Sequence, residues 1–112
     1  MTQLDEDLRR KEKAEEARWR FRQEKAFEIM AKRDKLFGVW AAGLLGLAGD
    51  GAAAYIRAVI ETGVTLGDDA MLGKVGGDLA AAGVAQDAGA LAARLGECEA
   101  AAQAIVAQGN MP

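Results

Sequence analysis

The chain has 112 residues, which is enough for one domain but not for two. It contains no histidine, one cysteine and one proline, which is the last residue. Without histidine the chain lacks the commonest general base and metal ligand, and a lone cysteine is a poor nucleophile that can form no internal disulfide. The composition therefore predicts a protein that is not an enzyme and has no metal site.

The charge is distributed unevenly along the chain. Residues 1–35 hold 11 Lys/Arg and 9 Asp/Glu, a net charge of +2, whereas residues 36–112 hold 3 and 8, a net charge of −5. The mixed signs in the first segment argue against nucleic-acid binding, which favours one sign. The longest uncharged run, residues 36–49, is too short for a bilayer span of roughly 20 residues, and the acidic N-terminus does not resemble a signal peptide. We therefore expect no direct membrane insertion.

The secondary structure is predicted to be helical throughout. β-branched residues are few and no run alternates with a period of two, while glycine clusters divide the chain into four segments. The fold class is therefore all-α: a small antiparallel four-helix bundle with a long first helix and a mobile N-terminal arm.

The N-terminal arm is expected to comprise residues 1–18. Between Arg9 and Arg18 the apolar residues are only Ala14 and Ala17, so little burial would offset the entropy lost on ordering. We expect the arm to be partly helical in isolation, with the bundle over residues 19–108 and a frayed C-terminus over residues 109–112.

The first helix is expected to end near residues 46–49, where glycines supply the geometry of a helix C-terminus. The uncharged run before this point is predicted to be a helix end buried on nearly all sides. Its apolar residues recur at a spacing of three or four and define the predicted core face: Leu36, Val39, Trp40, Gly43 and Leu44, with Phe37 and Leu45 beside them.

Capping residues and glycines set the expected bounds of the other three helices. Asp50 caps the second helix, which stops near Gly63; Thr65 or Asp68 caps the third, which ends at Gly83; Asp87 caps the fourth. The predicted inner faces are Ala52, Tyr55, Ile56, Val59 and Ile60 in the second helix, Leu72, Val75, Leu79 and Ala82 in the third, and Leu91, Leu95, Cys98, Ala102 and Ile105 in the fourth.

Three features have both a functional and a structural interpretation. Gly49, Asp50 and Gly51 precede a helix, where phosphate can bind, but a plain turn between helices is favoured because a P-loop ending is missing. The pair Asp68 and Asp69 lacks calcium-loop spacing, so capping is favoured over metal binding. Cys98 is favoured as a core residue.

Trp19 and Phe21 leave two alternatives open. They lie among arginines on a segment with charge on all sides. They either seat the first helix on the bundle or contact a partner.

A resemblance to a known family is carried mainly by the end of the first helix and the start of the second. Its residues are Phe27, the run Ala31-Lys32-Arg33-Asp34-Lys35-Leu36-Phe37-Gly38-Val39-Trp40-Ala41-Ala42, then Leu44-Leu45-Gly46, Gly49-Asp50, Ala54-Tyr55 and Val59, with a looser match through Asp68, Asp69, Lys74, Asp78-Leu79 and Gly83-Val84. These residues resemble the zeta subunit family of alphaproteobacteria, the inhibitor of the F-type ATP synthase, over about residues 20–107. Gly43 stands where that family usually has glutamate, and Asp34 where it often has asparagine.

The resemblance implies a regulatory function. The N-terminal segment would enter a catalytic α/β interface of the ATP synthase head, with the central stalk as a further contact, and block ATP hydrolysis while allowing synthesis. By residue type, we assign apolar contacts to Leu4 and Leu8, and a place on the same segment to Ala14 and Ala17. The expected polar contacts are Asp5, Glu6, Arg9, Arg10 and Lys11.

The same resemblance sets the expected location and ligands. The protein would be cytoplasmic and peripheral to the inner membrane through the ATP synthase. No cofactor is required, but some family members bind adenine nucleotide, so weak binding of ATP or ADP is expected. The alternative function is a nucleotide-binding helical regulatory module without inhibitory activity.

Overall fold

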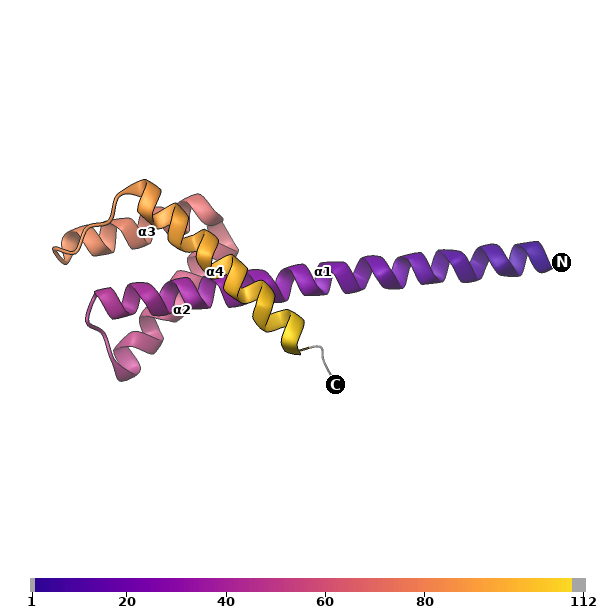
Figure 1. Cartoon of the computed structure of the whole chain (residues 1–112), viewed down its shortest axis with the longest axis horizontal. Helices are drawn as coiled ribbons and strands as arrows, with labels where there is room; N and C mark the ends of the chain where they lie inside the picture. Colours follow the sequence, from indigo (N-terminus) through magenta and orange to yellow (C-terminus); the bar gives the residue numbers. More distant parts are fainter. Residues whose placement is uncertain (1, 110–112) are drawn as a thin grey trace.

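The computed structural model describes residues 2–109 and contains four α-helices. They are α1 (Gln3–Leu44), α2 (Gly49–Leu66), α3 (Asp68–Ala81) and α4 (Ala88–Gly109), and no strand occurs among the described residues. Successive helices run in opposite directions (Figure 1). The predicted all-α bundle of four helices is confirmed. Of the expected frayed C-terminus, Gly109 is the last residue of α4 and residues 110–112 lie outside the described residues.

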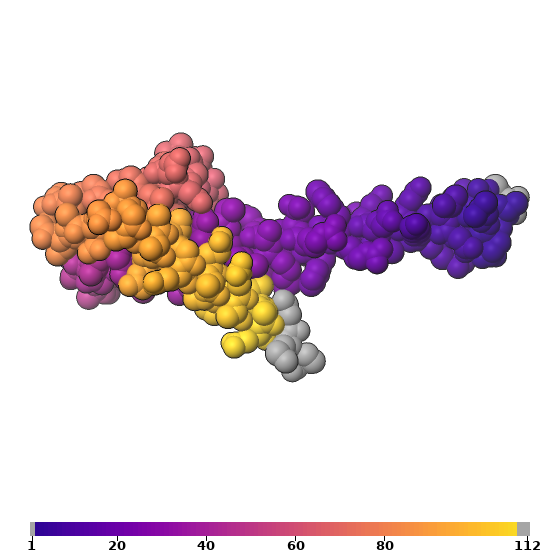
Figure 2. Space-filling view, turned by 45° about the horizontal axis from the view of Figure 1, so that its top comes forward, coloured from indigo at the N-terminus to yellow at the C-terminus, as the bar shows by residue number. Residues whose placement is uncertain are grey.

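The molecule is elongated because α1 is much longer than the bundle it belongs to. Its 42 residues correspond to about 63 Å of helix. The radius of gyration is 19.3 Å, where a compact chain of this length would have about 13 Å. Figures 1 and 2 show the N-terminal half of α1 projecting alone from the bundle. No residue from 2 to 32 is buried, and we call residues 3–24, which end before the partly buried Lys25, the free part of α1.

The core lies where the C-terminal third of α1 packs against the other three helices. Phe37 is fully buried at its centre, and Trp40 stacks on the Phe37 ring with 5.5 Å between the ring centroids. Trp40 and Tyr55 are only partly buried and pack against this core from its edge. The buried core cluster is Phe37, Ala41, Val59, Met71, Val75, Leu79, Leu91, Leu95 and Cys98.

The predicted core face of α1 is wrong in part: Phe37 is buried and Leu36, Trp40 and Leu45 pack against the core, but the face as a whole is rotated about the helix axis. Val39 is 46% exposed and Leu44 36%, and the surroundings of Gly43 are open, so this helix end is not buried on nearly all sides. The buried residues are instead Arg33, Asp34, Phe37, Gly38, Ala41 and Ala42. Small residues occupy this face because α2 approaches closely: a Cβ added at Gly38 would lie 3.3 Å from the Cα of Ile56.

The expected end of the second helix at Gly63 is also wrong. The helix continues to Leu66, and Gly63 is buried in its interior. A Cβ at Gly63 would lie 2.7 Å from Oδ2 of Asp34 and 2.9 Å from the sulfur of Met71. The glycine therefore permits close packing of α2 on α1 and α3, and it does not terminate the helix.

The helix ends agree only in part with the predicted caps. Asp87 is confirmed, because its Oδ1 accepts a hydrogen bond of 2.7 Å from the backbone N–H of Ala90. Asp50 and Thr65 do not cap: α2 begins after Ala48 and α3 after Gly67, in both cases without a side-chain cap. The side chain of Asp68 is turned toward Arg33 instead.

Two inner-face assignments near the ends of helices are wrong as well. In α4 the buried residue is Val106, whereas Ile105 is exposed. Ala82 follows the last residue of α3 and is exposed. Among residues 2–109, none of the helices combines the length and the hydropathy that a bilayer crossing requires.

The Gly63→Ala substitution should destabilise the bundle by about 1–3 kcal/mol, because the new methyl group has no room beside Asp34 and Met71. Gly43→Ala is the matched control: it also lies in a helix, nothing is within 4 Å of the added Cβ, and alanine should stabilise by about 0.5–1 kcal/mol. Urea unfolding of the two variants measures both changes. Equal effects on the free energy of unfolding would contradict the packing at Gly63.

Candidate functional site

The free part of α1 is a single exposed helix. Strong helix formers fill it, and its first turns carry local contacts: Arg10 pairs with Glu6 and Asp7, each at 3.8 Å, and Gln3 donates to Asp7 at 3.1 Å. Such exposed pairs contribute little individually. The helix therefore persists here as a continuation of the segment held by the bundle, without packing of its own.

One side of this helix, which we call the stripe, carries apolar residues at wide intervals, with Glu12, Glu15 and Arg22 between them. Leu8, Trp19, Met30 and Ala41 are spaced by eleven residues, which is close to three turns, so they stay within roughly 60° of one another around the axis. Leu4 and Ala26 lie beside them. The stripe leads directly into the core-facing side of α1, since Phe37 and Ala41 are fully buried.

The stripe residues of the free part are open to solvent. Leu4 is 66% exposed, Leu8 50% and Trp19 58%. Phe21 is also exposed, but it lies on the opposite side of the helix, where the ammonium group of Lys25 stands 5.3 Å from its ring centroid. Of the two predicted aromatic contact residues, only Trp19 thus belongs to the stripe.

The free part also has two halves of opposite charge. Residues 3–17 hold four Lys/Arg and six Asp/Glu, a net charge of −2, and residues 18–24 hold three and one, a net charge of +2. Midway along, Trp19 lines a shallow hollow together with Glu15, Glu16 and Arg22. Charges of both signs thus flank the exposed indole ring.

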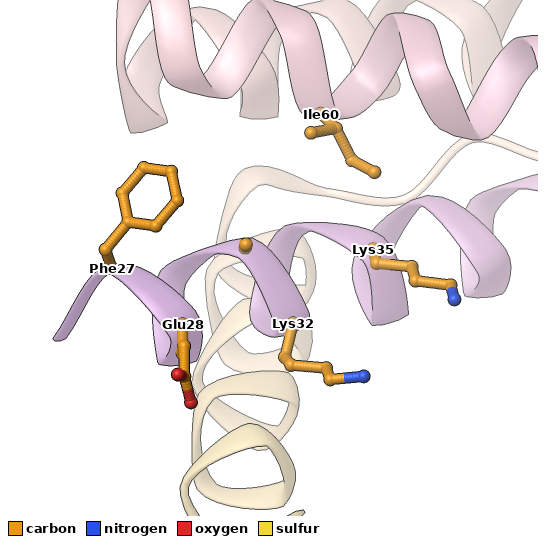
Figure 3. A pocket seen from close by; sticks show the side chains of 6 residues that line it. Phe27, Glu28, Lys32, Lys35 and Ile60 are labelled. Atoms are coloured by element: carbon orange, nitrogen blue, oxygen red, sulfur yellow. The ribbon is translucent and has the colours of Figure 1, made fainter. Parts of the chain in front are cut away.

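A groove of about 390 Å³ lies between α1 and α2, next to the free part. Figure 3 shows Ile60 of α2 facing α1 across the groove, with Phe27 at one end and Lys35 at the other, and with Glu28 and Lys32 on the far side of α1 from Ile60. Its lining is mostly apolar, apart from these lysines and Glu28, which pairs with Lys25 at 3.5 Å. The groove could accept an apolar group that carries negative charge.

A partly buried ion cluster joins α1 to the bundle near the point where the free part begins. The guanidinium of Arg33 donates to both carboxylate oxygens of Asp68 on α3, at 2.6 and 3.1 Å, and lies 3.6 Å from Glu99 on α4. Its Nε donates to Oδ1 of Asp34 at 3.0 Å. One cation thus joins three helices.

Neither Arg33 nor Asp34 was predicted to be buried. Each precedes a buried residue, Phe37 or Gly38, by four positions, which is the helical repeat of this face.

Asp34 is the member of the cluster whose negative charge is least compensated. It is fully buried, and its Oδ2 has no hydrogen-bond partner. Burial raises the pKa of the Asp34 carboxyl above its ordinary 3.8, and repulsion by Asp68 adds to the rise, while Arg33 opposes it. A single arginine shared among three carboxylates does not fully compensate a charge removed from water.

The other predicted site residues lie apart from the free part. Gly49, Asp50 and Gly51 form the exposed first turn of α2, where Asp50 adds negative charge. Cys98 is buried in the core as expected, and burial raises the pKa of its thiol. Within residues 2–109 no group of three or more Asp, Glu or Cys side chains could hold a metal ion.

The remaining arm residues all lie along the free part. Asp5 is partly exposed, and the others are exposed: Glu6, Arg9, Arg10, Lys11, Ala14 and Ala17. Their roles at a partner stay a prediction, as does the mobility of residues 1–18.

A family model described as ATPase inhibitor subunit zeta matches residues 1–105. The chain belongs to this family. The resemblance inferred from its residues is thereby confirmed, and the match extends through the N-terminal segment that the resemblance did not cover. Searches of curated proteins and of solved structures give no match. The zeta family is, by its description, a family of inhibitor subunits of an ATPase, which makes this chain a regulatory subunit.

The raised pKa of Asp34 predicts a specific pH dependence of stability. Because the folded state binds this proton more tightly than the unfolded state, the free energy of unfolding should fall as the pH rises from about 3.8 through the raised pKa. Asp34→Asn removes this titration, so its free energy of unfolding should fall less than that of the natural chain across this window. Urea unfolding between pH 3.5 and about 7 measures the difference. Asp69→Asn, at an exposed neighbouring position, is the control, and parallel curves for Asp34→Asn and the natural chain would contradict the assignment.

Proposed function

We propose that this protein inhibits ATP hydrolysis by an F-type ATP synthase, by inserting the free part of α1 into a catalytic α/β interface of the enzyme head. The observation that carries the proposal is the free part itself: a helix of about 33 Å with no buried residue and with exposed apolar side chains on one side. A helix with an apolar stripe is suited to a groove on another protein. The family match supports this reading.

In this mechanism the stripe and the charges have separate roles. Leu4, Leu8 and Trp19 bury apolar surface in the groove, at about 1.5–3 kcal/mol for each fully buried side chain. The acidic and basic residues between them select the groove and its orientation by charge complementarity. An α/β interface must open and close during catalysis, so a helix wedged in it opposes the closure that hydrolysis requires.

The bundle has the complementary task of holding the helix. It is too broad to enter the same groove, with transverse extents of 29 and 23 Å, so it limits how deeply α1 inserts. The groove at Phe27, with Lys32 and Lys35, faces the same end of the bundle and offers a second contact for an acidic, partly apolar surface of the enzyme head. An aromatic ring next to two lysines also suits a nucleotide, because the ring can stack on a base and the lysines can pair with phosphates. The expected weak binding of ATP or ADP stays a prediction.

The double substitution Leu4→Asp and Leu8→Asp should abolish inhibition without unfolding the bundle. Both side chains are exposed in the free protein, and charging them removes about 3 kcal/mol or more of burial at the interface, which corresponds to more than about 100-fold in the half-inhibitory concentration. The measurement is ATP hydrolysis by the isolated enzyme head at increasing inhibitor concentration.

The matched control is Val64→Asp with Leu66→Asp, which charges two exposed apolar residues at the end of α2, on the bundle. This control should inhibit like the natural chain. If the Leu4 and Leu8 variant inhibited equally well, the free part would not be the inhibitory element.

A further inference from the structure

The residues along the stripe follow a nearly symmetric order of apolar and charged side chains. From the N-terminus it has two leucines, Leu4 and Leu8, then the acidic Glu12 and Glu15, then Trp19. Beyond Trp19 come the basic Arg22 and then a second apolar pair. That pair is Ala26 and Met30.

Read in the opposite direction, the same order is apolar, basic, tryptophan, acidic, apolar. A second copy of the chain laid antiparallel along the stripe therefore presents apolar residues to apolar residues and basic residues to acidic ones. We propose that two copies of this protein associate through the free parts of α1, as an antiparallel helix pair related by a two-fold axis near residue 17. Such an interface is isologous, so every contact occurs twice.

One register satisfies the apolar and the charged positions together. When residue numbers across the interface sum to 34, Leu4 lies level with Met30 of the second copy, and Leu8 with Ala26. Glu12 then lies level with Arg22 of the second copy, and Glu15 with Trp19. In an antiparallel helix pair, directly opposed positions such as these form the central layers.

The length of the free part fits this register. Residue 2 of one copy lies level with residue 32 of the other, immediately before Arg33, the first buried residue of α1. Each helix tip therefore lies beside the bundle of the second copy, at the level of the groove that Phe27 and Ile60 line. The tip also carries Asp5, Glu6 and Asp7, which lie level with residues 27–29 of the second copy, between Lys25 and Lys32.

The polar layers make this a weak association with a defined register. Charged residues in the centre of a helix pair reduce its stability but strongly disfavour other registers and the parallel orientation. In a parallel pair Glu12 would face Glu12 and Arg22 would face Arg22, and both contacts would repel. Pairing covers Leu4, Leu8 and Trp19, so it would compete with docking to the enzyme head; only this last consequence rests on the proposed function.

Charge reversal tests the pairing with the full chain alone, by sedimentation equilibrium. The natural chain should show a reversible monomer–dimer equilibrium. Glu12→Arg and Arg22→Glu should each raise the dissociation constant at least tenfold, because each makes both central ion pairs repulsive. Glu24→Arg lies on the opposite side of the helix and should leave the constant unchanged.

The decisive outcome is rescue. The double variant Glu12→Arg with Arg22→Glu restores opposite charges and should associate within about threefold of the natural chain. An equimolar mixture of the two single variants should also associate, as a heterodimer. Residues 12 and 22 are about 15 Å apart along one helix, so no contact within a chain can account for rescue. A natural chain that stays monomeric up to about 1 mM, or single variants that neither the second substitution nor mixing rescues, would overturn the proposal.

Discussion

The shared guanidinium of Arg33 is the interaction on which the rest of the structure depends. It joins Asp34 on α1, Asp68 on α3 and Glu99 on α4 at the point where α1 leaves the bundle. A side chain with five donors in a rigid fork can hold several carboxylates at once, which a lysine cannot do. This junction fixes the start of a projecting helix and thereby the direction of every side chain on the stripe. The bundle thus holds the base of the free part in a fixed position, and the close packing at Gly63 brings α2 against α1 and α3.

The sequence was sufficient to predict that the chain forms four helices. It was insufficient to predict which side of α1 faces the core. The fold class, the end of α1 near Gly46 and the cap at Asp87 follow from local chemistry, because glycine and capping residues act within one turn. The rotation of α1 could not be read from Val39 and Leu44, since the contact with α2 was decided by Gly38, Ala41 and Ala42, which let the backbones approach. Hydropathy also gives no sign that Arg33 and Asp34 are buried, because their burial depends on partners far along the chain.

The candidate site shows the same division. Composition identified the N-terminal segment, because charge without large apolar residues predicts a helix with nothing to pack against. The stripe is less evident, because Leu8, Trp19 and Met30 are eleven residues apart and fall outside the window in which helical periodicity is usually sought. Only the observed continuity with Phe37 and Ala41 shows that the exposed stripe and the buried face are one side of one helix. One side of α1 is therefore buried in the core at one end and exposed to solvent at the other. The exposed end is suited to binding a helix or a groove of a partner.

The most direct test of this account compares the full chain with a shortened chain that begins at Trp19, in ATP hydrolysis by the enzyme head. Among residues 2–109 every buried residue lies at position 33 or later, so the shortened chain keeps its core and should fold. The account predicts that the full chain inhibits and that the shortened chain, shown to be folded by its circular dichroism and unfolding transition, does not. Equal inhibition by the two chains would contradict it, because the inhibitory surface would then lie on the bundle.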